Sequence, residues 1–411
     1  MSRRSSLFAI FFTFFIDNLG ATIIYPIFAP LFLEPSQGLI SPEHTYAFRV
    51  VMLGLFLGAY PLAQFFLAPL LGDYADHHGR KKTLLITTVG AFVGYLICGW
   101  SIHAHFVVIL FLGRLLMGAA SGNMSICLTA IADVCNSQKE KVRFYTLGSV
   151  IAGFTFVLGP YLGGKLSDPQ IFWLFTPSFP LFVGASLTVL NVIFLASSFK
   201  ETIVEKRAHS FDFIKSVHNI QLAFKTPSLK RLYTVFFFYL LSWNMLFQFV
   251  PAYLVDTFKS SNSTIGDVSA VLGGCWILGS LFLKLINRFI PSRVVICASA
   301  VVFTFLTVLS TQFEGLFLFT VIVGGAVFFA SFPWPLCASE ISHIAPDGIQ
   351  GQVMGLSQSI QSLAMLVAPL IVGPLLSAHH GVSFGLSALF GVVYLIIFLC
   401  SKKLFKSNID V

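Results

Sequence analysis

Two ionisable residues, Asp17 and Arg114, lie deep inside long apolar stretches of the sequence. A charged residue at the centre of a membrane-spanning helix costs roughly 2.5–3.5 kcal/mol on insertion scales, and it usually faces a cavity that marks a pathway. Burial raises the proton affinity of a carboxylate, and a nearby arginine lowers it. We therefore expect Asp17, near Arg114, to bind and release a proton. The alternative is a static buried ion pair that fixes two helices.

A second group of glycines and charges fills the segment Gly72–Lys82, which has the spacing G-x-x-x-D-x-x-G-R-K-K. Gly72 and Gly79 allow a tight turn at the membrane surface. Asp76 can lie at a helix N-terminus, where the helix dipole favours an anion. The segment is predicted to be a loop at the membrane surface, and one interpretation is a basic loop that only sets topology.

Other polar and aromatic side chains occur inside the apolar stretches. Tyr60 and Gln64 share a helix face, as do Asn244 and Gln248, because the members of each pair are four residues apart. These residues either line a substrate cavity or form hydrogen bonds between helices, and both interpretations stay open. The candidate cavity residues are Tyr60, Gln64, Asn123, Asn244, Gln248, Trp334, Gln358 and Gln361.

The sequence carries no residue pattern of an enzyme or of a metal site. It contains no P-loop, no H-E-x-x-H, no G-x-S-x-G and no clustered cysteine and histidine ligands. Its seven cysteines mostly lie in apolar stretches and are interpreted as small, reduced hydrophobic residues. We therefore expect no catalysis, no cofactor and no bound metal. An ion gradient, and not ATP, is the expected source of energy.

The composition indicates a membrane protein built from helices. Of 411 residues, 56% are hydrophobic and only 10% are charged, whereas soluble proteins carry about 25% charged residues. Within a bilayer only helices and closed barrels satisfy all backbone hydrogen bonds, and barrel strands alternate apolar and polar residues. The apolar runs here are long and continuous, which predicts an all-α fold.

Twelve membrane-spanning helices are predicted, and a polar stretch at 199–231 divides them six and six. A shift of 207 positions aligns sparse identities between the halves, such as Gly118 with Gly325, which indicates a duplication. We assign 1–198 to the first half and 232–411 to the second. The linker 199–231 carries an interfacial amphipathic helix or is simply solvated. The predicted spans are about 6–33, 48–71, 83–101, 106–132, 144–166, 178–198, 232–256, 265–287, 294–311, 315–341, 351–376 and 384–400.

The basic residues gather in the loops on one side of the predicted bundle. Of the 25 lysines and arginines, all except Arg49, Arg114, Lys165 and Lys259 fall on the side of the N-terminus. Cytoplasmic loops carry such an excess, so both termini are expected in the cytoplasm, at a bacterial inner membrane. The net charge of +8 then reflects topology and attraction to anionic lipid, and no nucleic-acid partner is expected.

Four motifs resemble those of transporters in the major facilitator superfamily. The Gly72–Lys82 segment is similar to the family's loop between helices 2 and 3, although His77 stands where Arg or Lys is common. Helix 4 carries L-x-x-x-R-x-x-M-G-x-A around Arg114, with methionine where glutamine is frequent. The run from Asp17 to Pro26 resembles the start of tetracycline-type exporters. Helix 5 carries G-P-x-x-G-G, which resembles the core of the antiporter motif of drug:proton exporters, at Gly159, Pro160, Gly163 and Gly164.

The resemblance implies a twelve-helix, proton-coupled secondary transporter that exports a small, partly apolar compound. In this family the loop after helix 2 latches the two halves together in the outward-facing state, and Asp133, at the end of helix 4, would be a natural partner for Arg80. Pro160 would bend helix 5 while the glycines admit a close neighbour, or the motif serves packing alone. The implied gating residues are Gly72, Asp76, Gly79, Arg80 and Asp133.

Two other functions stay open at this point. One is proton-coupled uptake of a nutrient (an amino acid, an organic acid or a metal chelate) on the same fold, and the other is a receptor or scaffold that does not transport. A non-transporting protein has little reason to keep Asp17 and Arg114 in the membrane. The expected partners are a small-molecule substrate, protons and membrane lipid, and the protein is expected to be a monomer.

Overall fold

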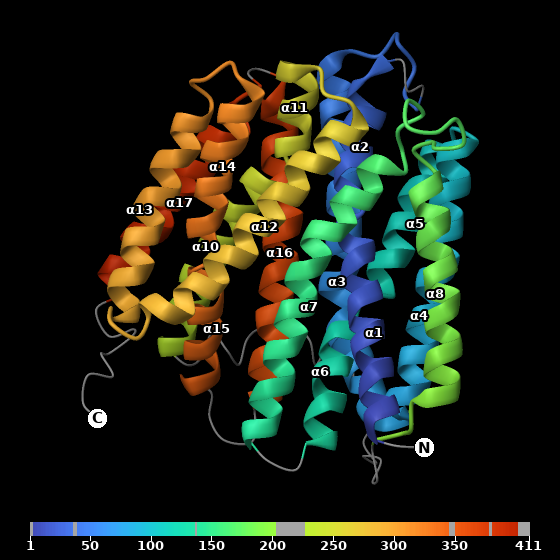
Figure 1. Ribbon diagram of the computed structural model, residues 1–411, viewed down its shortest axis with the longest axis vertical. Helices are drawn as coiled ribbons and strands as arrows, with labels where there is room; N and C mark the ends of the chain where they lie inside the picture. Colours follow the sequence, from blue (N-terminus) through green and yellow to red (C-terminus); the bar gives the residue numbers. More distant parts are fainter. Residues whose placement is uncertain are drawn as a thin grey trace.

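The computed structural model describes residues 3–35, 39–135, 138–202, 227–344, 350–377 and 380–401. Figure 1 shows the arrangement of its helices in space. Over these ranges the regular structure is helical and no strand occurs. The predicted all-α fold is confirmed, as expected for apolar segments that must pair their backbone groups internally.

The helices fall into two groups, one on each side of the polar stretch at 199–231. Those of the N-terminal half are α1 (Arg3–Thr22), α2 (Tyr25–Leu33), α3 (Tyr46–His78), α4 (Arg80–His103), α5 (Val107–Ala119), α6 (Asn123–Val134), α7 (Gln138–Lys165) and α8 (Phe179–Ser198). Those of the C-terminal half are α10 (Pro227–Phe247), α11 (Val250–Phe258), α12 (Asn262–Ile286), α13 (Ser292–Ser310), α14 (Leu316–Ala330), α15 (Pro333–Ile344), α16 (Gln350–Leu376) and α17 (Val382–Cys400).

Eleven stretches of the described chain are long and apolar enough to cross a membrane. Some of them unite two consecutive helices: Ser5–Leu33 contains α1 and α2, and Leu229–Phe258 contains α10 and α11. Helix α7, which packs along α12, supplies the twelfth span. The predicted architecture of two six-span halves is therefore confirmed.

The outer surface of the bundle is apolar, as a lipid-facing surface must be. Large hydrophobic side chains are exposed on α8, α12 and α13, among them Ile193, Leu278 and Phe305, which are 57%, 61% and 62% exposed. Soluble monomers rarely expose apolar patches larger than a few hundred Å². Together with the apolar spans, this surface shows an integral membrane protein.

Four spans are interrupted, and they are the first and the fourth of each half. The breaks separate α1 from α2, α5 from α6, α10 from α11 and α14 from α15. Pro26, Pro251 and Pro333 lie in the first turn of the helix that follows three of these breaks. Proline has no N–H to donate and fits the first turn of a helix, so each proline favours a new helix start. Interrupted helices at corresponding places in two halves are a frequent location of binding sites.

The two halves contact each other along α3 and α16 and along α7 and α12. Helix α1 begins and α17 ends at the same end of the bundle, which we call the N/C end; the other is the distal end (Figure 1). At the distal end α2 meets α11. A Cβ atom on Gly164 of α7 would lie 2.7 Å from the Cα atom of Gly266 of α12, so glycines are needed for these backbones to approach.

Polar contacts also join the halves at the distal end. Lys165 Nζ lies 2.7 Å from Asp267 Oδ2, and the Ser263 N–H donates to Asp168 Oδ2 at 3.3 Å. Residues 165 and 168 belong to the N-terminal half, and residues 263 and 267 to α12. Direct contacts thus join the two halves at the distal end.

Candidate functional site

A half-buried carboxylate, that of Asp17, lies among polar side chains in the interior of the N-terminal half. Asn123, the first residue of α6, donates from Nδ2 to Asp17 Oδ1 of α1 at 3.2 Å. Thr87 of α4 in turn donates to Asn123 Oδ1. Because Asn123 follows the break between α5 and α6, its amide reaches α1 and α4 together. The break therefore places a donor beside the carboxylate.

A cavity of about 20 Å³ adjoins Asp17. A polar cavity needs about 10–15 Å³ to hold a water molecule, so this cavity has room for roughly one water molecule. Thr13 and Asn191, which form a hydrogen bond of 2.9 Å, belong to its wall. The lining residues are Thr13, Ile16, Asp17, Gly20, Tyr60, Thr88, Ala91, Tyr95, Met117, Asn123, Thr188 and Asn191.

Arg114 is buried beside this cavity, and no acid pairs with it within the part of the chain that the structure describes. Its side chain is 2% exposed, and its guanidinium carbon lies 5.0 Å from the ring centre of Tyr60 and 5.3 Å from that of Phe28. Aromatic faces attract such a cation, but its Nε and Nη1 atoms have no hydrogen-bond partner among the described residues. Asp17 is also among the described residues, and no ion pair between the two is formed. The static ion pair considered from the sequence is therefore not present in this state. Tyr60 lies between the two charged residues, because it lines the cavity beside Asp17 and its ring contacts Arg114.

The other candidate cavity residues divide into two groups. Gln64 accepts a hydrogen bond from Ser362 of α16 at 3.0 Å, which links the halves. Gln248 donates to Asn244 Oδ1 at 2.9 Å and to the Met365 carbonyl at 3.2 Å. These side chains act as hydrogen-bonding ties between or along helices, whereas Tyr60 and Asn123 line the cavity. Three remain half-buried on α15 and α16: Trp334, Gln358 and Gln361.

Several residues of this site escaped the sequence analysis. Thr87 and Thr13 carry little signal, because threonine is common in membrane helices and often bonds its own helix. Tyr95 lies in the middle of the predicted span 83–101, where a tyrosine is less expected than at a membrane interface. That position is the one signal from which an additional cavity residue could have been predicted.

The glycines of the G-P-x-x-G-G motif in α7 serve close packing. A Cβ atom on Gly159 would collide with the Thr22 side chain, and one on Gly163 with the Ile23 carbonyl, at the break between α1 and α2. Thr22 also donates to the Thr155 carbonyl at 3.1 Å. Pro160 lies within α7. The motif thus fits α7 against the interrupted first span on one face and, through its last glycine, against α12 on the other.

The predicted loop Gly72–Lys82 is mostly helical, and a single residue makes the turn. Helix α3 continues to His78 and α4 begins at Arg80. The expectation that Gly72 forms part of a tight turn was wrong, because that residue lies within α3. Gly79 alone adopts φ +106°, a conformation that side chains with a Cβ atom rarely adopt. The side chain of Asp76 lies outside the described residues.

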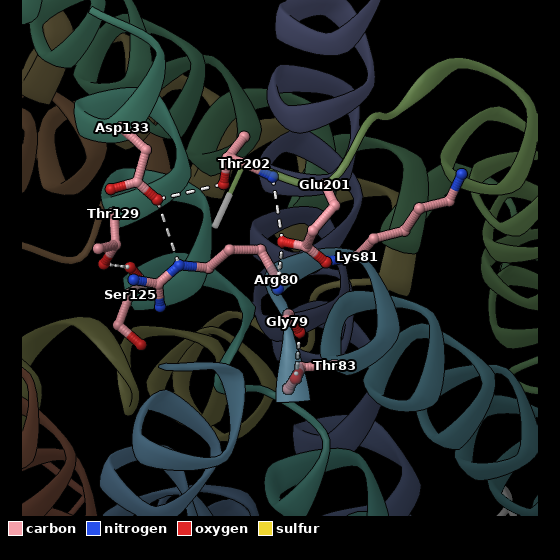
Figure 2. Close-up of polar contacts among 9 residues, drawn as sticks. All are labelled: Gly79, Arg80, Lys81, Thr83, Ser125, Thr129, Asp133, Glu201 and Thr202. Atoms are coloured by element: carbon pink, nitrogen blue, oxygen red, sulfur yellow. Dashed lines mark hydrogen bonds and ion pairs between the residues drawn. The ribbon is translucent and has the colours of Figure 1, made fainter. Parts of the chain in front are cut away.

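Arg80 and Asp133 do meet, and a third residue, Glu201, completes their cluster (Figure 2). Arg80 Nε lies 3.5 Å from Asp133 Oδ2. Glu201, just beyond α8, accepts the N–H groups of Arg80 and Lys81 at 2.8 and 3.1 Å. Thr202 donates to Asp133 Oδ2 at 3.1 Å. An anion therefore occupies the N-terminus of α4, as the helix dipole favours, but it is Glu201.

All members of this cluster belong to the N-terminal half or to the segment directly after it. It joins the start of α4 to the ends of α6 and α8 at the N/C end of the bundle. The sequence offered one signal for Glu201, an acid directly after the last apolar span of the half. The hydrogen bonds of Glu201 to backbone N–H groups depend on where the end of α8 lies relative to the start of α4. The hydrophobic periodicity of the sequence does not reveal that position.

Comparisons with known proteins agree with this architecture. The family model described as Major Facilitator Superfamily matches residues 10–369 and 232–406. The tetracycline resistance protein of class C from Escherichia coli is 25% identical over 400 residues, which cover 96% of each chain. The quinolone resistance protein NorA of Staphylococcus aureus is 24% identical over 385 residues, 92% of this chain and 91% of NorA. The crystal structure of the human organic anion transporter MFSD10 has the same fold, with a TM-score of 0.71 at 20% identity over 97% of this chain and 100% of that one.

Proposed function

The chain belongs to the Major Facilitator Superfamily and is a membrane transporter, not an enzyme, and we propose that it exports a small, partly apolar compound in exchange for protons. The observation that carries the proposal is the Asp17 carboxylate, which lies inside a membrane span beside a water-sized cavity. Ionisable residues in such places are functional sites by default.

In this proposal Asp17 is the group that binds and releases the coupling proton. When it is ionised, the amide of Asn123 donates to it, and the buried guanidinium of Arg114 supplies positive charge in the same half. When it is protonated, the surrounding side chains of Thr13 and Tyr60 remain compatible with a neutral acid. The alternation of wet and dry surroundings during transport then loads and unloads the proton.

The direction of transport and the sidedness belong to the same proposal. Relatives named for resistance to tetracycline and to quinolones favour export of a partly apolar compound from a bacterial cell. The excess of lysine and arginine on the side of the termini favours a cytoplasmic N/C end in the inner membrane. With the distal end closed by contacts such as Lys165 to Asp267, this state would face the cytoplasm.

Transport by the purified protein in proteoliposomes tests the proposal. A panel of labelled compounds that includes tetracycline and a quinolone is offered with and without an imposed pH gradient. We expect uphill movement of at least one compound that depends on the gradient, and we expect Asp17→Asn to abolish it while exchange down a substrate gradient persists. Glu43→Gln, at an exposed acid outside the membrane spans, is the control and should behave as the parent. Uphill movement by Asp17→Asn would show that the proton site lies elsewhere.

A further inference from the structure

Two side chains at the distal end, those of Tyr46 and His380, contact the same carboxylate oxygen of Asp256. Tyr46 Oη donates a hydrogen bond to Asp256 Oδ2, and His380 Nδ1 lies 3.3 Å from the same oxygen. Tyr46 Oη is also 3.5 Å from His380 Nδ1, and the two rings meet edge to face with centroids 5.8 Å apart. Tyr46 begins α3 in the N-terminal half, whereas Asp256 belongs to α11 and His380 precedes α17. The cluster therefore crosses the seam between the halves.

The histidine of this cluster faces water, and the carboxylate lies beneath it. The side chain of His380 is 55% exposed and that of Asp256 is 8% exposed. Histidine ordinarily changes charge between about pH 5 and about pH 8, and a buried carboxylate depends on the donors and charges around it. Among the described residues, the titratable groups that contact the ring of His380 are Asp256 and Tyr46. Lys259, which caps α11, is exposed.

We propose that Tyr46, Asp256 and His380 form a second proton-binding site, at the distal mouth of the protein, whose occupancy controls the contact between the halves. While His380 is neutral, Tyr46 donates to a carboxylate that forms no ion pair with a lysine or arginine among the described residues. Hydrogen bonds to ionised acceptors are about twice as strong as those between neutral groups. A proton on His380 balances that charge within the C-terminal half, so the bond across the seam becomes weaker. Acid on the distal side therefore favours separation of the halves there.

A second contact across the same seam provides an internal reference. Lys165 Nζ and Asp267 Oδ2 lie 2.7 Å apart, and this contact involves no histidine. The pH response is accordingly confined to the histidine cluster. The inference rests on the proposed function only for its physiological meaning: in a proton-driven exporter, external acid would promote the opening through which Asp17 receives its proton.

Amide hydrogen exchange of the protein in lipid nanodiscs tests the site without any substrate. Exchange is followed by mass spectrometry at about pH 5.5 and about pH 7.5 and corrected for the intrinsic pH dependence of exchange. We expect the first turns of α3 and the last turns of α11 to exchange on the order of five-fold faster at the lower pH, as the loss of charge assistance to one hydrogen bond implies. His380→Gln should show no such pH response, and Tyr46→Phe should exchange fast at both pH values. His103→Gln, at an exposed histidine on the distal end of α4, is the matched control and should keep the response.

Three results would overturn the inference: no pH response in the parent protein, greater protection at low pH, or a full response in His380→Gln. Exchange in the interior turns of α4 and α8 reports whether each variant is folded. Asp17→Asn should retain the pH response although it loses gradient-driven transport. Failure of the distal site and failure of the proposed function are thus separate outcomes.

Discussion

Removal of the Glu201 carboxylate tests what holds the turn between α3 and α4. This side chain accepts the first two N–H groups of α4, those of Arg80 and Lys81, at 2.8 and 3.1 Å. Loss of a side-chain cap costs about 0.5–2 kcal/mol, and loss of an anion from a helix N-terminus costs about 0.3–1 kcal/mol. Because Glu201 is exposed, water replaces part of what is lost. We therefore expect Glu201→Ala to destabilise this turn by about 1–2 kcal/mol, which corresponds to a factor of about 5–30 in local opening.

Residue-resolved amide exchange at Arg80 and Lys81 measures that factor directly. Both oxygens of Glu201 accept an N–H group. Glu201→Gln keeps one acceptor oxygen but loses the charge and the second acceptor, so its exchange should rise about two-fold to five-fold, below that of Glu201→Ala. Glu314→Gln, an exposed acid before α14, is the control and should not change exchange at either amide. If Glu201→Ala exchanges at the parent rate at both amides, the carboxylate does not stabilise the turn and the reasoning fails.

Three further predictions concern the seam between the halves, the proposed proton site and the topology. Gly164→Val should keep α7 from closing on α12, which stops transport and speeds amide exchange at the start of α12; Gly148→Val on the same helix, where a Cβ atom meets nothing within 4 Å, should be harmless. Asn123→Leu removes the donor to the Asp17 carboxylate and should lower gradient-driven transport roughly ten-fold, as expected for one hydrogen bond to a charged group, while substrate exchange persists; an unchanged transport rate would remove the amide from the mechanism. Tags at Ser2 and Val411 should both be shielded from external reagents in intact cells, and labelling of one alone would mean an odd number of spans.

The twelve spans were predictable because the bilayer imposes a simple physical demand. A segment that crosses it must be apolar over about 20 residues and helical, and both properties are visible in the sequence. The helix ends were less predictable. Helix α3 runs to His78, beyond the predicted end at residue 71, because a helix continues into water as long as no residue breaks it. Gly72 was expected to form part of a turn, but glycine is tolerated within helices. Helix α3 ends only at Gly79, which has a positive φ.

The pairing of charges inside the protein was harder to predict from the sequence. Asp17 and Arg114 were recognised because charge is rare within membrane spans. Their expected proximity assumed that both side chains point at each other, which depends on helix rotation. The break before Asn123 instead brings an amide to Asp17, and Arg114 stacks on the ring of Tyr60. A break in a helix changes the direction of every side chain after it, and periodicity assumes that no break occurs.

The contacts that close the distal end have strengths that suit a transporter with two states. A transporter that alternates between two conformations needs their free energies to lie within a few kcal/mol of each other. A shift in their populations from about 1:99 to about 99:1 takes about 5.5 kcal/mol. The Lys165 and Asp267 side chains are 28% and 49% exposed, so their pair contributes about 0–1 kcal/mol. The hydrogen bond from Tyr46 to Asp256 is better shielded and contributes more, about 1.5–3 kcal/mol while the carboxylate is charged. One proton on His380 therefore acts on the stronger of these two contacts, which is why a single titration at the distal mouth can alter the balance between the states.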